Sequence, residues 1–318
     1  MPTRKYPCPY NTQFPFAKTT MTHRKPLDAF AINLMLVLCM LWGLQQVAVK
    51  TAVPYMGAIL QIGLRSAVAA LMVCVLIWWR GDRLSLRDGT FWPGIGAGVL
   101  FAMEFLCIAL GLQYTTASHM SVFLYTAPIF TVLGLHWSIA GERLGMMQWA
   151  GALAAFAGIA VAFSEGFTAQ SRDWSDMLIG DALGVLGGIF WSATTILIRR
   201  SALSEAPPAT TLLYQLGSCG LILLAIAAIG GQASTAVLNG VVWASLVFQS
   251  VIVAFFSYLL WFWMLRTYLA SRLSVFSFLT PMFGVGFGVL LLDDSVDIRF
   301  AIGAALVMVG VVMVNLRK

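Results

Sequence analysis

The chain has 318 residues, of which 60% are hydrophobic and only 10% are charged, and its formal net charge is +6. A soluble globular domain carries about 45–50% apolar and about 25% charged residues, so this composition excludes a soluble protein. The basic residues stand in short connectors between apolar runs and form no extended basic face, which argues against nucleic acid as a partner. The chain is therefore expected to be an integral protein of the lipid bilayer.

Residues 1–29 are polar, and they are expected to form a disordered cytoplasmic tail. Ten apolar runs follow, each long enough to cross a hydrocarbon core, which needs about 20 residues. Because backbone polar groups in lipid must pair internally, each run is expected to be a helix, which predicts an all-α membrane protein. The predicted transmembrane helices are 30–49, 57–79, 92–112, 117–139, 145–164, 177–198, 210–229, 241–264, 272–292 and 298–315.

The basic residues near the helix ends indicate orientation, because cytoplasmic loops carry an excess of Lys and Arg. With the N-terminus inside, fifteen basic residues fall on the cytoplasmic side. Only Lys50, Arg172 and Arg299 fall on the outer side. Both termini are therefore predicted to be cytoplasmic.

One segment of the chain occurs twice. ASHMSVFLYTAPIF starts at Ala117 and ASRLSVFSFLTPMF starts at Ala270, with seven of fourteen positions identical. The copies begin the fourth and ninth predicted helices, so the repeating unit is five helices, and an odd unit must cross the membrane in the opposite sense the second time. The sequence thus predicts two inverted five-helix repeats, residues 30–164 and 177–315, an architecture typical of secondary transporters.

Paired glycines support the duplication. Gly151 and Gly158 recur as Gly303 and Gly310, each 152 positions later. They give the fifth and tenth predicted helices small faces, which permit close approach of helices in lipid. Such faces are expected to form either an internal scaffold or the surface of a homodimer.

Several motifs carry a family resemblance. The segment LWGLQQVAVK (Leu41 to Lys50), the two copies of the repeated segment and GERL at Gly141 resemble the drug/metabolite transporter superfamily, specifically proteins with two EamA domains. The resemblance runs from about residue 30 to the end of the chain. It implies a ten-helix transporter of small metabolites such as amino acids, moved outward across a bacterial inner membrane. One departure is Asp294 in LLDDSVD, where the family usually has Glu.

Two ionisable residues lie at mid-depth in neighbouring predicted helices. An ionisable residue inside the bilayer is a functional candidate by default, because charge there is costly. Counted at about 1.5 Å per residue from the cytoplasmic ends, the depths of Arg65 and Glu104 differ by only about 3 Å. One interpretation makes Glu104 the proton-titrating or amine-binding group, with Arg65 as the anchor of a substrate carboxylate. The other is a static ion pair that fixes helix packing. Glu104 is the one carboxylate that the sequence analysis places at mid-membrane.

Aromatic and amide side chains offer a lining for a small amphipathic solute, since ligand pockets are mostly apolar with a few placed polar groups. Two prolines, one in each repeat, are expected to kink their helices, either as gate hinges or as static bends. The two histidines of the apolar region, His119 and His136, are interpreted as residues of the helix boundaries. The lining candidates are Trp42, Gln45, Gln46, Trp191, Tyr214, Gln215, Tyr258 and Trp261, and the hinge candidates are Pro128 and Pro281.

The sequence argues against catalysis and against a cofactor. It contains no HExxH or GxSxG motif and no P-loop, and its five cysteines lack metal-ligand spacing, so no catalytic residues, metal site or ATP-driven pump are expected. The predicted function is a secondary exporter of a small amphipathic metabolite, exchanged for protons by alternating access. Two alternatives remain open: a membrane channel or facilitator, and a non-transporting receptor or assembly protein.

Overall fold

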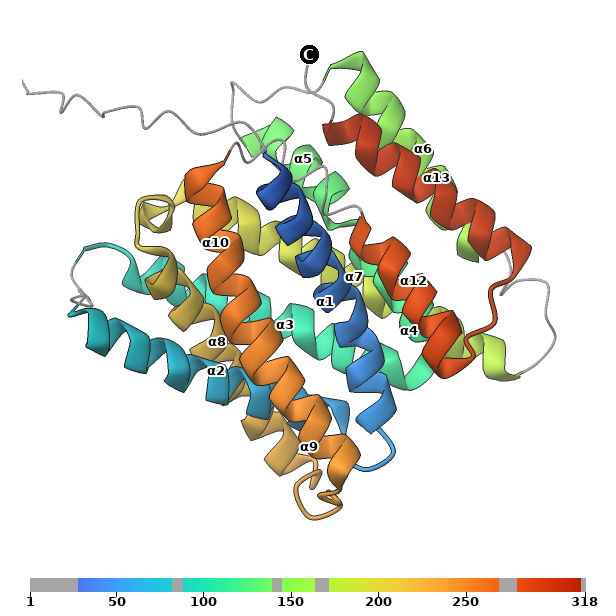
Figure 1. Ribbon diagram of the computed structural model, residues 1–318. Coiled ribbons are helices and arrows are strands. Elements are labelled where there is room, and N and C mark those ends of the chain that lie inside the picture. The colour runs from blue at the N-terminus through green and yellow to red at the C-terminus, as the bar shows by residue number, and fades with distance from the viewer. Residues whose placement is uncertain (1–27, 82–87, 139–144, 164–171, 269–278, 316–318) are drawn as a thin grey trace, which may run out of the picture.

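The computed structural model describes residues 28–81, 88–138, 145–163, 172–268 and 279–315. These residues form helices and short connections, with no β-strand among them (Figure 1). The GERL motif and the first nine residues of the second repeated segment lie outside the described residues. An all-helical protein is what the sequence predicts.

The helices follow the apolar runs closely. Local caps set several of their ends: Asp28 accepts a hydrogen bond from the Ala31 amide (2.8 Å) at the start of α1, and Gly81 ends α2 with a left-handed φ of 71°. The helices are α1 (Ala29–Ala52), α2 (Ala58–Arg80), α3 (Phe91–Tyr114), α4 (Ala117–Leu124), α5 (Ala127–Ser138), α6 (Met146–Phe163), α7 (Arg172–Arg200), η1 (Ala202–Ser204), α8 (Pro208–Ile229), α9 (Gly240–Val247), η2 (Phe248–Ser257), α10 (Tyr258–Thr267), α12 (Leu279–Leu292) and α13 (Ile298–Asn315).

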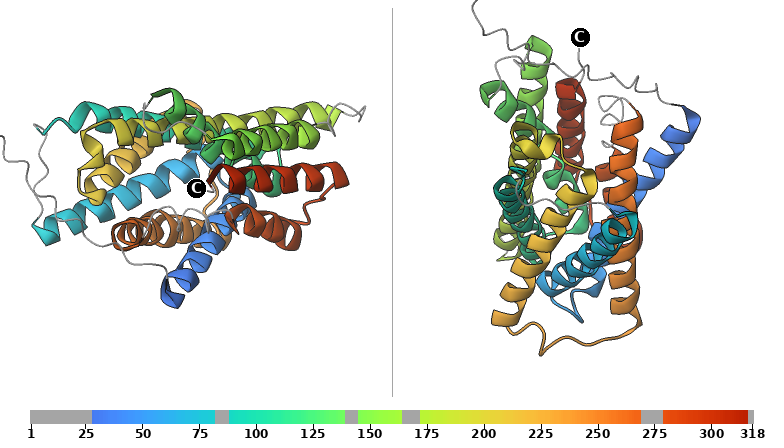
Figure 2. Two further views of the ribbon diagram at one scale, coloured as in Figure 1. Left: turned by 90° about the horizontal axis from the view of Figure 1, so that it is seen from above. Right: turned by 90° about the vertical axis from the view of Figure 1, so that its left-hand side faces the viewer.

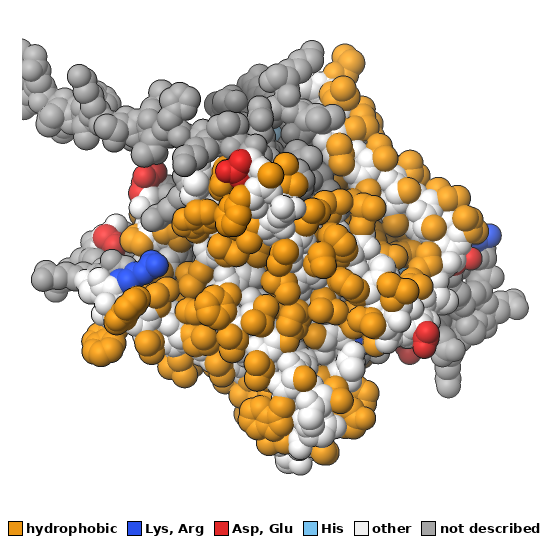
Figure 3. Space-filling model, viewed as in Figure 1, with side chains coloured by type: hydrophobic (Ala, Val, Ile, Leu, Met, Phe, Trp, Pro, Cys, Tyr) orange, Lys and Arg blue, Asp and Glu red, His pale blue; other side chains and the backbone are white. Residues whose placement is uncertain are grey.

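Six helices among the described residues are long and apolar enough to cross a membrane. Shorter apolar helices cover 146–162, 279–292 and 298–313. Hydrophobic side chains cover most of the face seen in Figure 3, and the visible charged groups lie toward its periphery. An outer surface this apolar fits contact with lipid.

Two of the predicted helices are not the uniform α-helices that the sequence suggested. Residues 117–139 were expected as one helix, but Tyr125 and Thr126 interrupt it between α4 and α5. The eighth predicted helix contains a ten-residue π-helical stretch, η2, between α9 and α10. Hydropathy measures only burial in lipid, so it cannot detect a change in the backbone hydrogen-bond pattern.

The helices share two ends, which we name by their residues. At the Lys50 end, Lys50 Nζ donates hydrogen bonds to the carbonyls of Leu112 and Thr115 (2.7 Å to Thr115), where α3 gives way to α4. At the Arg80 end, α2 ends and the Tyr268 hydroxyl donates to Asp28 (3.1 Å). These contacts tie the ends of consecutive and distant helices together.

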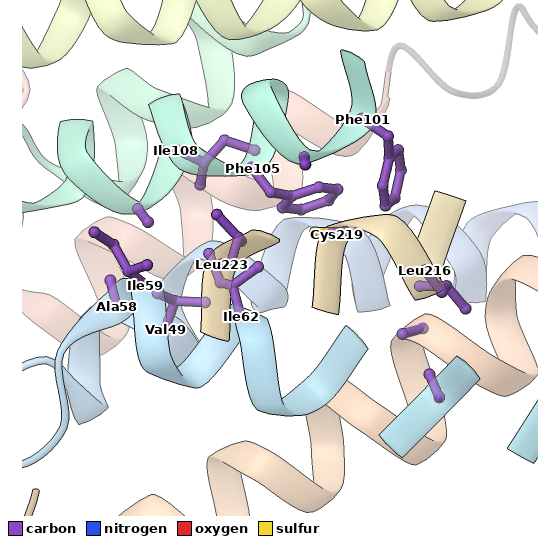
Figure 4. Packing of buried hydrophobic residues seen from close by; sticks show 14 of the residues in the cluster. Val49, Ala58, Ile59, Ile62, Phe101, Phe105, Ile108, Leu216, Cys219 and Leu223 are labelled. Carbon is purple, nitrogen blue, oxygen red and sulfur yellow. The ribbon is translucent and has the colours of Figure 1, made fainter. Parts of the chain in front are cut away.

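The main core lies between α2, α3 and α8. Figure 4 shows Phe101, Phe105 and Ile108 pointing from α3 toward the other two helices. A second cluster joins α4, α5, α6 and α13, and a third joins α1 to α10. The polar residues described below therefore sit among closely packed apolar side chains.

Helices α6 and α13 pack along each other at one side of the molecule (Figures 1 and 2). A Cβ atom placed on Gly158 would lie 2.6 Å from the Gly303 carbonyl, and one on Gly303 would lie 2.6 Å from the Gly158 carbonyl. A Cβ atom placed on Gly310 would likewise clash with the Gly151 carbonyl. Of the two roles predicted for these glycines, the structure shows the internal scaffold.

Gly303→Ala is expected to lower the unfolding temperature of the purified protein, because its Cβ would meet backbone atoms that cannot move aside. Overpacking of this kind costs about 1–3 kcal/mol. Gly217→Ala is the matched control, since no atom lies within 4 Å of its added Cβ and alanine favours the helix. Equal unfolding temperatures for Gly303→Ala and the parent protein would contradict this packing.

Candidate functional site

Arg65 of α2 and Glu104 of α3 are both buried in the interior, at 0% and 5% exposure. Glu104 lies about 20 Å along α3 from Phe91 and about 15 Å from the other end of that helix, counting 1.5 Å per residue. Glu104 is thus far from either end of its helix. The structure places the two sequence candidates in the same region, because the Arg65 guanidinium packs on the ring of Phe105, the residue after Glu104.

The hydrogen-bonding capacity of the two charged side chains is not fully used. Among the residues that the structure describes, no guanidinium nitrogen of Arg65 has a hydrogen bond of regular geometry, and neither does Glu104 Oε2. The Arg65 guanidinium lies 4.2 Å from the centre of the Phe105 ring, a cation–π contact, and the Tyr258 hydroxyl lies beside it outside regular hydrogen-bond geometry. Buried polar groups are normally satisfied, so these exceptions mark the site.

One side of the site is formed by Tyr125, the residue that interrupts the fourth predicted helix. Its ring meets Trp191 of α7 edge-on at 5.2 Å, and its hydroxyl lies near that of Thr280 in α12. Tyr125 is also within electrostatic range of Glu104 and Tyr258. The break between α4 and α5 therefore brings a polar aromatic side chain to the centre of the bundle. Tyr125 is not among the lining candidates predicted from the sequence, although it belongs to the repeated segment.

A second aromatic wall joins α1 to the π-helical region. Trp42 Nε1 donates a hydrogen bond to Ser257 Oγ (2.9 Å), and the Trp42 ring meets Trp261 edge-on at 5.6 Å. Ser257 is the last residue of η2 and directly precedes Tyr258. π-Helical segments frequently occur at functional sites, and this one ends at the buried Ser257.

Other sequence candidates lie elsewhere or have no shown contact with this centre. Tyr214 packs on Gly94 and meets Phe91 at 6.5 Å, near the Arg80 end and about 15 Å from Glu104 along α3. Gln45, Gln46 and Gln215 are buried, and among the described residues Gln46 Oε1 has no hydrogen-bond partner.

Of the two hinge candidates, Pro128 is in the first turn of α5, directly after the break at Tyr125 and Thr126. Proline is tolerated there because the amides of the first helical turn have no intrahelical partner. Pro281 is the third described residue of α12. The residues before α12, 269–278, lie outside the described residues, so the form of the chain ahead of Pro281 is not described.

A polar cluster at the Lys50 end was missed by the sequence analysis. His119, interpreted as a boundary residue, is buried (3% exposed), and its Nδ1 lies 2.9 Å from Oδ2 of the buried Asp181 in α7. Thr115 Oγ1 donates to the other oxygen of Asp181. The signal was available, because Asp181 interrupts the apolar run LIGDALGVLG.

Asp294, the shortened family position, has a defined role near this cluster. Its Oδ2 accepts hydrogen bonds from the backbone nitrogen (3.0 Å) and the hydroxyl (2.8 Å) of Ser118, in the first turn of α4. A carboxylate at that position accepts a hydrogen bond from the Ser118 amide, which has no partner within the helix. The positive end of the helix dipole also stabilises its charge. Aspartate is thus long enough for this contact.

These features define a class: a helical membrane protein with polar and aromatic groups enclosed at its centre. The chain belongs to the EamA-like transporter family, whose profile matches residues 29–164 and 178–316. The resemblance to the drug/metabolite transporter superfamily is confirmed, and the protein is a membrane transporter of that type.

Individual relatives agree with this assignment. An uncharacterized transporter of Archaeoglobus fulgidus is 30% identical over 280 residues, which cover 86% of this chain and 94% of the relative. A probable amino-acid metabolite efflux pump of Escherichia coli is 22% identical over 284 residues, covering 87% and 92%. A solved crystal structure with 20% sequence identity shares the fold, with a TM-score of 0.62 over 90% of this chain and 97% of that one.

Proposed function

We propose that the protein is a secondary transporter that exports an amino acid or a similarly sized amphipathic metabolite, bound at Arg65 and Glu104. The observation that carries this proposal is the buried Arg65 guanidinium, none of whose nitrogens has a hydrogen-bond partner among the described residues, together with the buried Glu104, whose Oε2 has none either. Leaving a buried polar group unpaired costs roughly 1–3 kcal/mol, and more for a charged group. A ligand with both a carboxylate and an ammonium group would satisfy the two side chains at once.

The surroundings of the two charges favour a ligand that is partly apolar. Tyr125 and Trp191 form one half-buried aromatic pair, and Trp42 and Trp261 form another. Aromatic side chains combine large apolar faces with polar edges. The name of the Escherichia coli relative, an amino-acid metabolite efflux pump, supports the same substrate class and the outward direction.

We further propose that the chain crosses the membrane ten times as two inverted repeats, 30–164 and 177–315. The reciprocal packing of Gly158 with Gly303, and the pairing of α2 with α8, join helices that the duplication makes equivalent. Such contacts between equivalent helices are expected when two repeats are related by a twofold axis. The basic residues orient both termini toward the cytoplasm of a bacterial cell, and Glu104 is proposed to exchange protons for substrate.

The orientation predicts how the two ends of α8 react with an impermeant maleimide in intact cells. A cysteine at Ser234, exposed beyond the end of α8, is expected to be labelled, and one at Glu205, exposed before its start, is expected to be protected. The variants are made in a background without native cysteines, and permeabilised cells show that both positions are reactive. Labelling at Glu205 alone would reverse the proposed orientation.

The substrate proposal is tested by thermal-shift screening of the purified protein against the common amino acids, followed by liposome uptake of those that stabilise it. A zwitterionic amino acid is expected to raise the unfolding temperature, because a ligand that binds only the folded state stabilises it. If only compounds without a carboxylate stabilise the protein, the role proposed for Arg65 is wrong. Ionic conductance in planar bilayers without saturable uptake would favour a channel.

A further inference from the structure

Helix α4 is held from two sides at the Lys50 end. Ser118 binds Asp294, which follows α12, and the next residue, His119, pairs with Asp181 of α7. Consecutive residues of one short helix therefore contact two partners more than sixty positions away in the chain. The contacts join residues 118 and 119 of the first proposed repeat to residues of the second.

Glycines let the helix backbones approach closely at the same place. A Cβ on Gly288 of α12 would lie 3.2 Å from the Ser118 nitrogen and 2.5 Å from Asp294 Oδ2. On the α7 side, a Cβ on Gly180 would lie 2.7 Å from the Thr115 nitrogen, and one on Gly184 would lie 3.0 Å from Phe123 Cβ. An added methyl group at any of these three glycines would crowd the chain around α4, so α7 and α12 approach α4 closely at this end.

The remaining groups around α4 strengthen the closure. The His119 ring stacks on Phe300 of α13, with ring centres 3.9 Å apart and planes 4° from parallel. Lys50, whose Nζ binds the carbonyls at the end of α3, is also within electrostatic range of Asp294. The charged and titratable groups that the described residues bring to this cluster are thus Lys50, His119, Asp181 and Asp294.

We propose that these contacts form the latch of an external gate, which separates the central site from the outside while the Lys50 end is closed. The inference rests on the proposed function, because release of substrate outward requires α4 to part from α7 and from α12. Opening would break the contacts of Asp181 and Asp294 and expose both carboxylates to water. Hydration of the freed carboxylates offsets much of the lost interaction, since an intramolecular hydrogen bond contributes only a small net free energy, and the latch is therefore reversible.

The test uses Cys39 as the single remaining cysteine, because it is buried close to Tyr125 and Thr280 at the central site. An impermeant methanethiosulfonate reagent is applied to the external face of intact cells. Asp181→Ala and Asp294→Ala are each expected to raise the labelling rate of Cys39 about fivefold or more, because each removes a contact made only in the closed state. Asp297→Ala is the control, since that half-exposed carboxylate at the same end accepts a hydrogen bond from the Arg299 amide and belongs to neither contact of α4.

Gly288→Ala is a second test of the latch that changes no charge. Its added methyl group would hold α12 away from α4. It is expected to raise labelling as well, and size-exclusion chromatography selects the variants that fold. Unchanged external labelling of Cys39 in the folded variants would overturn the latch. So would an increase seen only from the cytoplasmic face in inverted vesicles. Faster external labelling in a protein that transports no amino acid would keep the latch and refute the proposed substrate.

Discussion

Arg65→Gln is expected to weaken amino-acid binding about 10- to 100-fold, which is the effect of losing hydrogen bonds between a charged group and its partner. Glutamine keeps some hydrogen-bonding capacity but has no charge to attract a substrate carboxylate. The dissociation constant is measured by isothermal calorimetry on purified protein. Arg80→Gln, at the exposed end of the same helix, is the matched control and should bind normally.

The double variant Arg65→Gln with Glu104→Gln separates a binding role from a packing role. The single changes each leave one buried charge without its counterpart, so both are expected to lower the unfolding temperature, and the double variant should recover stability. Recovery of stability without recovery of binding is the outcome that the proposed site requires. Recovery of both would show that the two charges act only in packing, and strictly additive effects would show that they are not coupled.

Glu104→Gln is expected to abolish the response of transport to a proton gradient while weakening substrate binding much less. Glutamine preserves the shape of the side chain and most of its hydrogen bonds but cannot titrate. In inverted membrane vesicles the lumen corresponds to the periplasm, so acidifying the lumen should drive substrate uptake in the parent protein and not in the variant.

Gln215→Glu serves as the control for this measurement, because it adds a carboxylate at another buried position without restoring Glu104. It should not rescue the proton response when combined with Glu104→Gln. A full response in Glu104→Gln itself would move proton coupling to another residue, or would favour facilitated diffusion.

Much of the helical architecture follows from the sequence, because hydropathy reports directly on burial in lipid. The same reasoning brings Arg65 and Glu104 to one depth, and the structure packs the Arg65 guanidinium on Phe105, next to Glu104 in α3. The glycine pairs also predicted a close helix contact. Gly158 and Gly303 pack against each other, and they lie in the two helices that the duplication makes equivalent.

Other features needed the three-dimensional structure. Hydropathy could not show that Tyr125 interrupts a helix, because a break depends on backbone hydrogen bonds as well as on burial. The depth of Tyr214 along its helix did not show which residue it would contact. In the structure it packs on Gly94, near one end of α3. The His119 and Asp181 pair joins residues that are 62 positions apart. Asp181 stands out in its apolar run, but one sequence without an alignment does not show that His119 is its partner.

Counterflow in proteoliposomes tests the central claim most directly, because alternating access requires one site that serves both faces in turn. Vesicles are loaded with an unlabelled amino acid selected by thermal shift, and uptake of a trace of the labelled compound is followed from outside. We expect a transient accumulation of label above equilibrium that saturates with concentration and is lost in Arg65→Gln. Uptake that never exceeds equilibrium and rises linearly with concentration would contradict the account and indicate a channel.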